Sequence, residues 1–362
     1  MEGLRKIDWY ISKKFITTFF LSLLLIIVIV IIFDLAEKID YFVKNDAPLK
    51  AIIFDYYCNY IPYLVNMFAS LFVFITVIFF TSRMAANSEI IAILSCGVNF
   101  HRMMVPYIAS ATLIALLSLG LTFFVIPHAN ATRVDFEAKY IKRHNNYNLR
   151  DLHYQISPGQ FVYIESFSRW NNTAYKFTIE DMDGHKLTRK VSAETAVWDS
   201  TLAGWKLNKV FIRDYTSGLQ DHVSFKEQQD TVIALQIKDL FNNEKTVEAL
   251  NIRELNELIK TQRMRGDENV MYAAIEKQRR VTMPFSALIL TIIGVSLSAR
   301  KRRGGTGWNI AIGIALAFSY IFFLRMSEMF VYTDTLPPGV AMWLPNLLYM
   351  VIAFFLYKRA CK

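Results

Sequence analysis

The sequence predicts an α-helical membrane protein with six transmembrane helices and a β domain inserted between the third and the fourth. Hydrophobic residues make up 54% of the 362 residues, and the mean hydropathy is +0.27, which is too apolar for a soluble protein of this length. The apolar residues gather in three long segments on each side of residues 128–280, a region that has the pattern of short strands followed by helices.

Six apolar segments reach or approach the length that crosses a bilayer as a helix, roughly 17 to 25 residues. They are Phe15–Phe33, Pro62–Ser82, Met103–Ile126, Val281–Ser298, Trp308–Leu324 and Ala341–Tyr357. Basic residues precede the first segment, but no small-residue cleavage site follows it. We therefore interpret it as a retained span and not as a cleaved signal peptide.

Basic residues in the short loops predict the orientation, because Lys and Arg concentrate on the cytoplasmic side of a membrane. One side holds Arg5, Lys6, Lys13, Lys14, Arg83, Arg102, Arg300, Lys301, Arg302, Arg303, Lys358, Arg359 and Lys362, and the other holds Lys38, Lys44, Lys50 and Arg325. We expect both termini and residues 87–97 to be cytoplasmic and residues 128–280 to lie outside the cytoplasm. This distribution accounts for the net charge of +9 without a nucleic-acid partner.

The region between Tyr154 and Lys238 has the pattern of an antiparallel β sandwich or roll. Short apolar runs at 160–165, 175–180, 196–198 and 204–212 alternate with turn residues, as at 181–184. The run Phe161–Ile164 is apolar on both faces, which suits either a sheet covered on both sides or one that lines an apolar groove. The covered core is the favoured interpretation, because buried strands usually have this pattern.

Two helices are expected to connect the β region to the fourth span. Asn251–Glu254 resembles a capping box, and an apolar stripe follows before Gly266 ends the first helix. A second helix starts near Asp267 and runs into the fourth span without Gly or Pro until Pro284. The expected layout is three spans in 1–127, a β domain in 128–250, a helical connector in 251–280 and three spans in 281–362.

Residues 87–97 form a segment too short and too polar at its ends to cross a bilayer. Ser88 is a possible helix cap, Glu89 suits the first turn of a helix, and Gly97 is a natural stop. Ile90, Ile93 and Leu94 share one face by their spacing. The pattern predicts an amphipathic surface helix whose apolar face meets either lipid headgroups or a partner protein.

The sequence contains no recognised catalytic motif. It has no GxxxxGK[ST] phosphate loop, no HExxH, no GxSxG and no cluster of His and Cys. We therefore expect no enzyme activity, no cofactor and no metal site. Cys58, Cys96 and Cys361 are too widely separated to indicate a disulfide framework.

Charged residues near the outer ends of the spans are expected to form ion pairs. Asp34 and Lys38 are four residues apart, and Arg325 and Glu328 are three apart. Pairing at helix ends is the favoured interpretation for Asp34 and Arg325. Lys38 and Lys44 have a second possible role, since ammonium groups at headgroup depth can bind the phosphates of an anionic lipid.

Three stretches together resemble the LptF/LptG (YjgP/YjgQ) family of lipopolysaccharide export permeases. Ser88–Gly97 looks like the coupling helix of that family. Leu250–Leu255 with Glu276–Pro284 is similar to its helix pair before the fourth span, and Ser298–Phe318 is similar to its basic, glycine-rich connection between the fourth and fifth spans. The likeness covers essentially the whole chain.

The resemblance implies a six-span permease subunit of the inner membrane with a periplasmic β-jellyroll domain between helices 3 and 4. Such a subunit pairs with a second LptF/LptG-type chain above an LptB-like ATPase dimer, and it passes lipopolysaccharide to LptC- and LptA-like bridge proteins. Under this resemblance Ser88, Glu89, Ile90, Ile93, Leu94 and Gly97 couple the chain to the ATPase. The expected lipid-binding residues are Lys38, Lys44, Arg325, Phe161, Tyr163 and Phe177.

The alternative function, from a different class, is that of a membrane scaffold coupled to an ATPase. In that case a partner ATPase moves the outer domain, and no lipid crosses. The sequence does not decide between an F-like and a G-like subunit.

Overall fold

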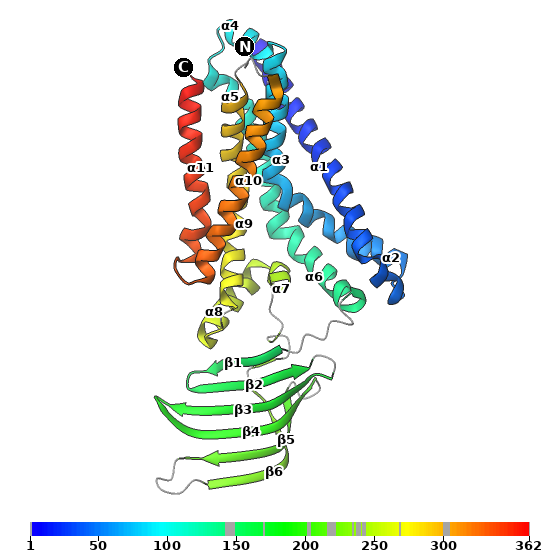
Figure 1. The fold of residues 1–362 in the computed structure, drawn as a ribbon, viewed down its shortest axis with the longest axis vertical. Helices are drawn as coiled ribbons and strands as arrows, with labels where there is room; N and C mark the ends of the chain where they lie inside the picture. The colour runs from blue at the N-terminus through cyan, green and yellow to red at the C-terminus, as the bar shows by residue number, and fades with distance from the viewer. Residues whose placement is uncertain are drawn as a thin grey trace. The chain divides into compact units, whose positions relative to one another are not determined.

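The computed structural model of the chain contains six helices that are long and apolar enough to cross a membrane, as the sequence predicts. The structure describes residues 2–141, 149–168, 171–200, 204–215, 222–233, 235–236, 240, 244–267, 269–299 and 305–361. The basic loop Arg300–Arg303, which contributed to the predicted orientation, lies outside the described residues. The described helices and strands form two compact units (Figure 1).

The helical unit consists of Met1–Ile141, Glu248–Ile252 and Ala274–Lys362. Its helices are α1 (Glu2–Lys44), α2 (Leu49–Ala51), α3 (Cys58–Ala86), α4 (Glu89–Ser95), α5 (Phe100–Gly120), α6 (Ile126–Phe136), α9 (Val270–Ser298), α10 (Gly305–Tyr332) and α11 (Pro338–Ala360). Short π-helical stretches at Ile52–Tyr57, Leu121–Val125 and Glu137–Ile141 extend the second and third spans. The spans are therefore longer than the apolar segments in the sequence.

Both terminal segments lie at the α4 end of the bundle (Figure 1). Near the N-terminus, Asp8 accepts hydrogen bonds from Arg102 of α5 at 2.9 and 2.5 Å. Near the C-terminus, Tyr357 hydrogen-bonds to His101, also on α5. Seven of the basic residues that predicted the cytoplasmic side have described side chains at this end. They are Lys6, Lys13, Lys14, Arg83, Arg102, Lys358 and Arg359.

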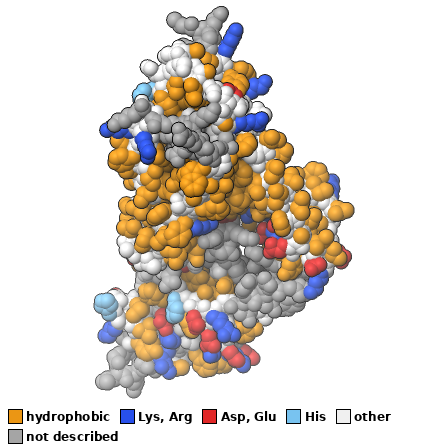
Figure 2. Space-filling model, turned by 45° about the horizontal axis from the view of Figure 1, so that its top comes forward, with side chains coloured by type: hydrophobic (Ala, Val, Ile, Leu, Met, Phe, Trp, Pro, Cys, Tyr) orange, Lys and Arg blue, Asp and Glu red, His pale blue; other side chains and the backbone are white. Residues whose placement is uncertain are grey.

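The surface of the helical unit is apolar over most of the face that Figure 2 shows. On α1 the exposed side chains include Leu21, Leu24, Leu25 and Phe33. An apolar surface of this extent is stable in contact with lipid tails or with another apolar chain. The chain has the surface of an integral membrane protein.

Two glycines allow α9 and α10 to pack closely against α3. A Cβ atom on Gly294 would lie 3.0 Å from Val77, and one on Gly313 would overlap the side chain of Ile78. Helices in a membrane associate largely through such close packing, because lipid tails are as apolar as the side chains. Ile78 is almost fully buried, so its side chain has little room to move away.

The other unit contains one six-stranded antiparallel sheet with the strands in sequence order. The strands are β1 (Leu149–Ser157), β2 (Gln160–Ser168), β3 (Thr173–Asp183), β4 (Lys186–Asp199), β5 (Gly204–Asp214) and β6 (His222–Thr231). An inserted antiparallel β domain between the third and fourth spans is thus confirmed. The turn expected at 181–184 lies slightly later, because β3 continues to Asp183.

One face of the sheet forms the core of this unit. Val162 and Ile164 on β2 are buried, and Ile164 is opposite Phe177 on β3. The core continues through Trp205 on β5, whose indole N–H donates a hydrogen bond to the carbonyl of Leu235 at 2.9 Å. The favoured interpretation, a sheet covered on both sides, is correct for the face of Val162 and Ile164 and wrong for the other face, where Phe161 is exposed.

Two helices follow the sheet, α7 (Glu244–Glu248) and α8 (Ile252–Arg265). Leu255 and Ile259 of the predicted apolar stripe are buried, and Gly266 has a φ of +64° directly after the helix. Beyond Asn269, α9 runs as a single helix from Val270 to Ser298 with Pro284 inside it. The predicted helix that continues into the fourth span without interruption is therefore present.

Replacing Gly313 by Leu should destabilise the helical unit. The new side chain has to enter space that Ile78 occupies, and overpacking of this kind costs about 1–3 kcal/mol. Gly307 is the matched control, since it lies on the same helix and a Cβ atom there would contact no other part of the described chain within 4 Å. We expect Gly313→Leu to lower the melting temperature of the full chain in nanodiscs and Gly307→Leu to leave it unchanged. Equal melting temperatures for the two variants would contradict the packing described here.

Candidate functional site

The helix α4 lies between α3 and α5 and has two turns, as the sequence predicts. Ser88 precedes it in the left-handed conformation, with a φ of +64°, and its side chain makes no capping hydrogen bond. The expected capping role of Ser88 is therefore wrong. Gly97, with a φ of +82°, donates its N–H to the carbonyl of Leu94 at 3.0 Å and ends the helix as predicted.

Glu89 is bound to the start of α1. Its carboxylate accepts a hydrogen bond from the Tyr10 hydroxyl at 2.9 Å and lies 3.5 Å from the Lys14 ammonium. The side-chain amide of Asn87 donates to the other oxygen at 3.3 Å. Burial alone would raise the pKa of Glu89, but these hydrogen bonds and the charge of Lys14 lower it below its usual value. Glu89 therefore remains ionised and holds α4 to α1.

The predicted apolar face of α4 is divided between the core and the surface. Ile90 is fully buried in the bundle core, and Ile93 packs against the same core. Leu94 is exposed, and so is Ile91, which the spacing did not place on that face. Because Ile90 and Ile93 point inward, the apolar surface that α4 offers consists of Ile91 and Leu94. The coupling roles of the six residues stay predictions.

A second polar cluster surrounds Lys38 near the other end of α1. Lys38 donates hydrogen bonds to Asp34 and to the hydroxyl of Tyr56, which confirms the expected pair of Asp34 and Lys38. Tyr56 and Tyr57 also donate to the Asp34 carboxylate, at 3.0 and 3.3 Å. Only 17% of the Lys38 side chain is exposed. Lys44, at the end of α1, is exposed.

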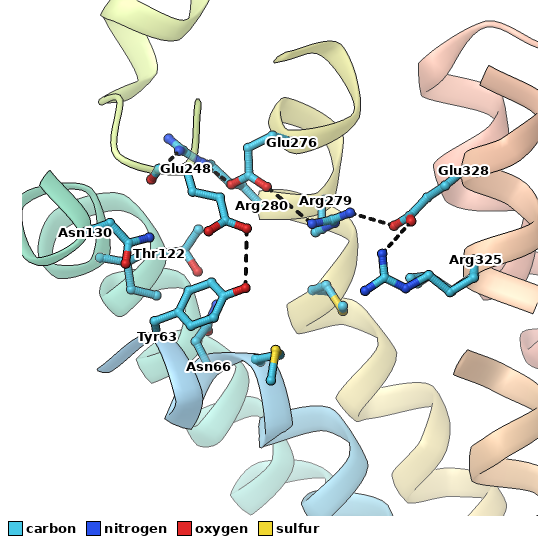
Figure 3. Close-up of a pocket in the computed structure, with 14 residues that line it drawn as sticks. Tyr63, Asn66, Thr122, Asn130, Glu248, Glu276, Arg279, Arg280, Arg325 and Glu328 are labelled. Atoms are coloured by element: carbon cyan, nitrogen blue, oxygen red, sulfur yellow. Dashed lines mark hydrogen bonds and ion pairs between the residues drawn. The ribbon is translucent and has the colours of Figure 1, made fainter. Parts of the chain in front are cut away.

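A polar pocket opens between α3, α6, α9, α10 and the end of α7 (Figure 3). The sequence did not predict it. The pocket has a volume of about 90 Å³ and lies within the helical unit. Its polar lining residues are Tyr63, Asn66, Thr122, Asn130, Glu248, Glu276, Arg279, Arg280, Arg325 and Glu328. Charged side chains at such positions in a membrane protein are costly and need partners.

Arg279 on α9 is the centre of an ion-pair network along one wall of the pocket. It donates to Glu328 of α10 at 2.7 Å and lies 3.8 Å from Glu276 on its own helix. Arg325 donates to the other oxygen of Glu328 at 2.8 Å, which confirms the expected pair. Glu276 also accepts a hydrogen bond from Arg280 at 2.9 Å. Glu328 is nearly buried, whereas 66% of the Arg325 side chain is exposed.

Glu248, the last residue of α7, lies on the other side of the pocket. The Tyr63 hydroxyl donates to its carboxylate at 3.3 Å, and Arg133 of α6 lies 3.9 Å away. Arg133 is itself buried and lies 3.7 Å from Glu137. Burial, and next the nearby charge of Glu276, raise the pKa of Glu248 to about 7.

The available sequence signal for this network was the spacing of Glu276, Arg279 and Arg280 at the start of a span. Among the described residues, no group of three or more His, Cys, Asp or Glu side chains could hold a metal ion. The ion pairs of Arg279 and Arg280 and the raised pKa of Glu248 support structural ion pairing and proton binding.

The predicted lipid-binding residues of the sheet lie on opposite faces. Phe177 is fully buried in the core, whereas Phe161 is 37% exposed on the other face. Tyr163 shares the face of Phe161 and donates a hydrogen bond to Asp151 at 3.1 Å. The structure therefore does not bring these three side chains into one groove. Their role in lipid binding stays a prediction.

Removing Arg279 should cost far more stability than removing Arg325, although both bind Glu328. Arg279→Ala leaves a nearly buried carboxylate with only an exposed partner, and breaking such a pair costs at least about 2 kcal/mol. Arg325→Ala removes an exposed ion pair worth about 1 kcal/mol or less. Thermal unfolding of the two variants in nanodiscs checks the order, and an equal or reversed loss would contradict the central place of Arg279.

Comparison with known proteins supplies the identity. No curated protein matches the chain. The family described as lipopolysaccharide export system permease LptF/LptG matches residues 9–359, which is nearly the whole chain. Six membrane helices with an inserted antiparallel β domain agree with the architecture that the resemblance implied. The chain belongs to the LptF/LptG family of lipopolysaccharide export permeases and is a multi-pass protein of the inner membrane.

Proposed function

We propose that the chain is one permease subunit of an ABC transporter that extracts lipopolysaccharide from the inner membrane and passes it to a periplasmic bridge. The observation that carries the proposal is α4, a short helix at the end of the bundle that presents Ile91, Leu94 and part of Glu89 at its surface. The sequence has no phosphate-binding loop. A separate ATPase has to supply the energy, and α4 is the element suited to receive it.

The proposed orientation places the α4 end and both termini in the cytoplasm and the β domain in the periplasm. Basic residues gather at the α4 end, and this is the side on which the positive-inside rule puts them. The proposed partners follow from the family. They are an LptB-like ATPase dimer at α4, a second six-span LptF/LptG-type chain, and LptC- and LptA-like bridge proteins.

The predicted lipid-binding residues differ in how accessible their side chains are to a lipid. Lys44 and Arg325 are exposed, so their charges can reach the phosphates of lipopolysaccharide, and Arg325 keeps an exposed guanidinium group while it binds Glu328. Lys38 has to leave Asp34 and Tyr56 first. In the β domain Phe161 is accessible, whereas acyl chains reach Phe177 only if the core opens. We propose Lys44, Arg325 and Phe161 as the first contacts of the lipid.

Glu89→Lys tests the proposed docking at α4. It reverses the charge that a basic residue of the ATPase would meet, and it places a cation beside Lys14. We expect at least a tenfold loss of lipid-stimulated ATP hydrolysis in the complex purified from native membranes, which corresponds to about 1.4 kcal/mol of coupling free energy. Glu257→Lys on the exposed surface of α8 is the matched control.

Tyr10→Phe separates docking from local structure, because it removes an internal hydrogen bond of Glu89 and leaves the carboxylate in place. The ATPase should still co-purify with Tyr10→Phe and be lost with Glu89→Lys. Unchanged co-purification and unchanged hydrolysis in Glu89→Lys would contradict the assignment of α4.

Photocrosslinking tests whether lipid uses the exposed or the buried face of the sheet. A photoreactive residue at position 161 should crosslink to lipopolysaccharide, because this side chain is accessible. A probe at position 177 should crosslink only during ATP turnover, when the core opens. Absence of lipid crosslinks from both positions during turnover would favour the scaffold function, in which the β domain moves without lipid.

A further inference from the structure

Asn130 on α6 is a buried amide without a hydrogen-bond partner. Its relative exposure is 0%, and neither its side-chain nitrogen nor its oxygen has a partner among the described residues. A buried amide in this state lowers the stability of the folded chain, because it loses its hydrogen bonds to water on folding and forms none within the protein. The side chain lines the polar pocket of the helical unit (Figure 3). The pocket is therefore the place from which the missing partner has to come.

The size and charge of the pocket select the ligand. A volume of about 90 Å³ accommodates roughly three water molecules. The charged lining residues balance in sign, with Arg279, Arg280 and Arg325 against Glu248, Glu276 and Glu328. The amide of Asn130 both donates and accepts hydrogen bonds. A small neutral molecule that also donates and accepts fits these groups, and water is that molecule.

Glu248 is the group in the pocket that is suited to exchange a proton. Tyr63 of α3 donates to its carboxylate, and Arg133 of α6 lies near it beside Glu137. From α9, Glu276 and Arg279 act on its charge, and Arg280 donates to its backbone carbonyl at 3.3 Å. Arg325, which also lines the pocket, is largely exposed, so the pocket reaches the surface at that side chain.

We propose that this pocket is a hydrated proton-binding site, in which water solvates Asn130 and exchanges a proton with Glu248. The proton on Glu248 controls how firmly the segment Glu248–Ile252 is held to α3 and α6. This site is independent of the proposed partners at α4, and it acts at the point where the chain returns from the β domain into the helical unit.

The direction of the pH effect follows from the raised pKa of Glu248, which is about 7 in the folded chain against 4.5 for an ordinary glutamate. The folded arrangement binds the proton more tightly than the unfolded chain does. Its stabilising effect is fully present below pH 4.5 and is lost as the pH rises through 7. Near neutral pH, Glu248 is charged in part of the molecules, and the segment Glu248–Ile252 is held less firmly in those.

Asn130→Leu tests whether water occupies the pocket, because the leucine side chain has nearly the shape of asparagine and no hydrogen-bonding atoms. In a hydrated pocket the variant removes partners of bound water, so the melting temperature of the full chain in nanodiscs should fall. In a dry pocket it removes an unsatisfied amide, so the melting temperature would rise and overturn the proposal. Gln262→Met provides the reference, since Gln262 is also a buried amide without a partner among the described residues but does not line this pocket. We expect its melting temperature to rise.

Glu248→Gln tests whether protonation of Glu248 controls how firmly residues 248–252 are held. Hydrogen–deuterium exchange of residues 248–252, corrected for the intrinsic rate, should show about tenfold weaker protection at pH 8 than at pH 6 in the unmodified chain, because the protonated fraction changes about tenfold across pH 7. The glutamine keeps the acceptor for Tyr63 and cannot ionise, so its protection should not depend on pH. Glu257→Gln should behave like the unmodified chain. Constant protection in the unmodified chain, or a retained pH dependence in Glu248→Gln, would overturn the proposal.

Discussion

The pairing of charges inside the helical unit is the constraint on which the rest of the structure depends. A charge in a low-dielectric environment is stable only next to an opposite charge or to hydrogen-bonding groups. Arg279 connects α9 to α10 through Glu328, and Tyr63 of α3 donates a hydrogen bond to Glu248 beside Arg133 of α6. None of these helices can move far from its neighbours without exposing an unpaired charge. The network therefore defines which helices move together, and it does so where the chain re-enters the helical unit.

The first span has a polar attachment at each end. Near its start, Tyr10 and Lys14 bind Glu89 of α4, and 20 residues after Lys14 the cluster of Asp34, Lys38 and Tyr56 begins. The helix between them is continuous from Glu2 to Lys44. A displacement of α4 is therefore passed along a stiff element toward Lys38 and Lys44, where the proposed function places the lipid phosphates. In the proposed function, this helix is the physical route from ATP hydrolysis by the partner ATPase on one side of the membrane to lipid release on the other.

The features that the sequence predicted depend on local pattern. The six spans follow from long apolar runs, α8 from a capping box and an apolar stripe, and the Gly97 stop from the freedom of glycine to adopt a positive φ. The pairs of Asp34 with Lys38 and of Arg325 with Glu328 follow from helical spacing. Each of these predictions needs only residues that are near one another in the chain.

The features that the sequence did not predict depend on tertiary packing. Spacing alone could not tell that Ile90 faces the core and Ile91 the surface, because both faces of α4 carry apolar residues. β6 is missing from the sequence prediction because its apolar alternation is limited to Val223 and Phe225 and the residues that follow are polar. The pocket unites Tyr63, Asn130 and Glu248 from distant parts of the chain, so no local pattern indicated it. Similarly, Phe161 and Phe177 both suggested a groove, and only the register of β2 and β3 separates their faces.

The most direct test of the proposed export function is the transfer of lipopolysaccharide from proteoliposomes that contain the complete complex to a soluble bridge protein. Lipopolysaccharide should leave the bilayer only when this chain, its companion subunit, the ATPase and ATP are all present. A complex that contains this chain and hydrolyses ATP, yet leaves all lipopolysaccharide in the bilayer with the bridge protein present, would contradict the proposed function.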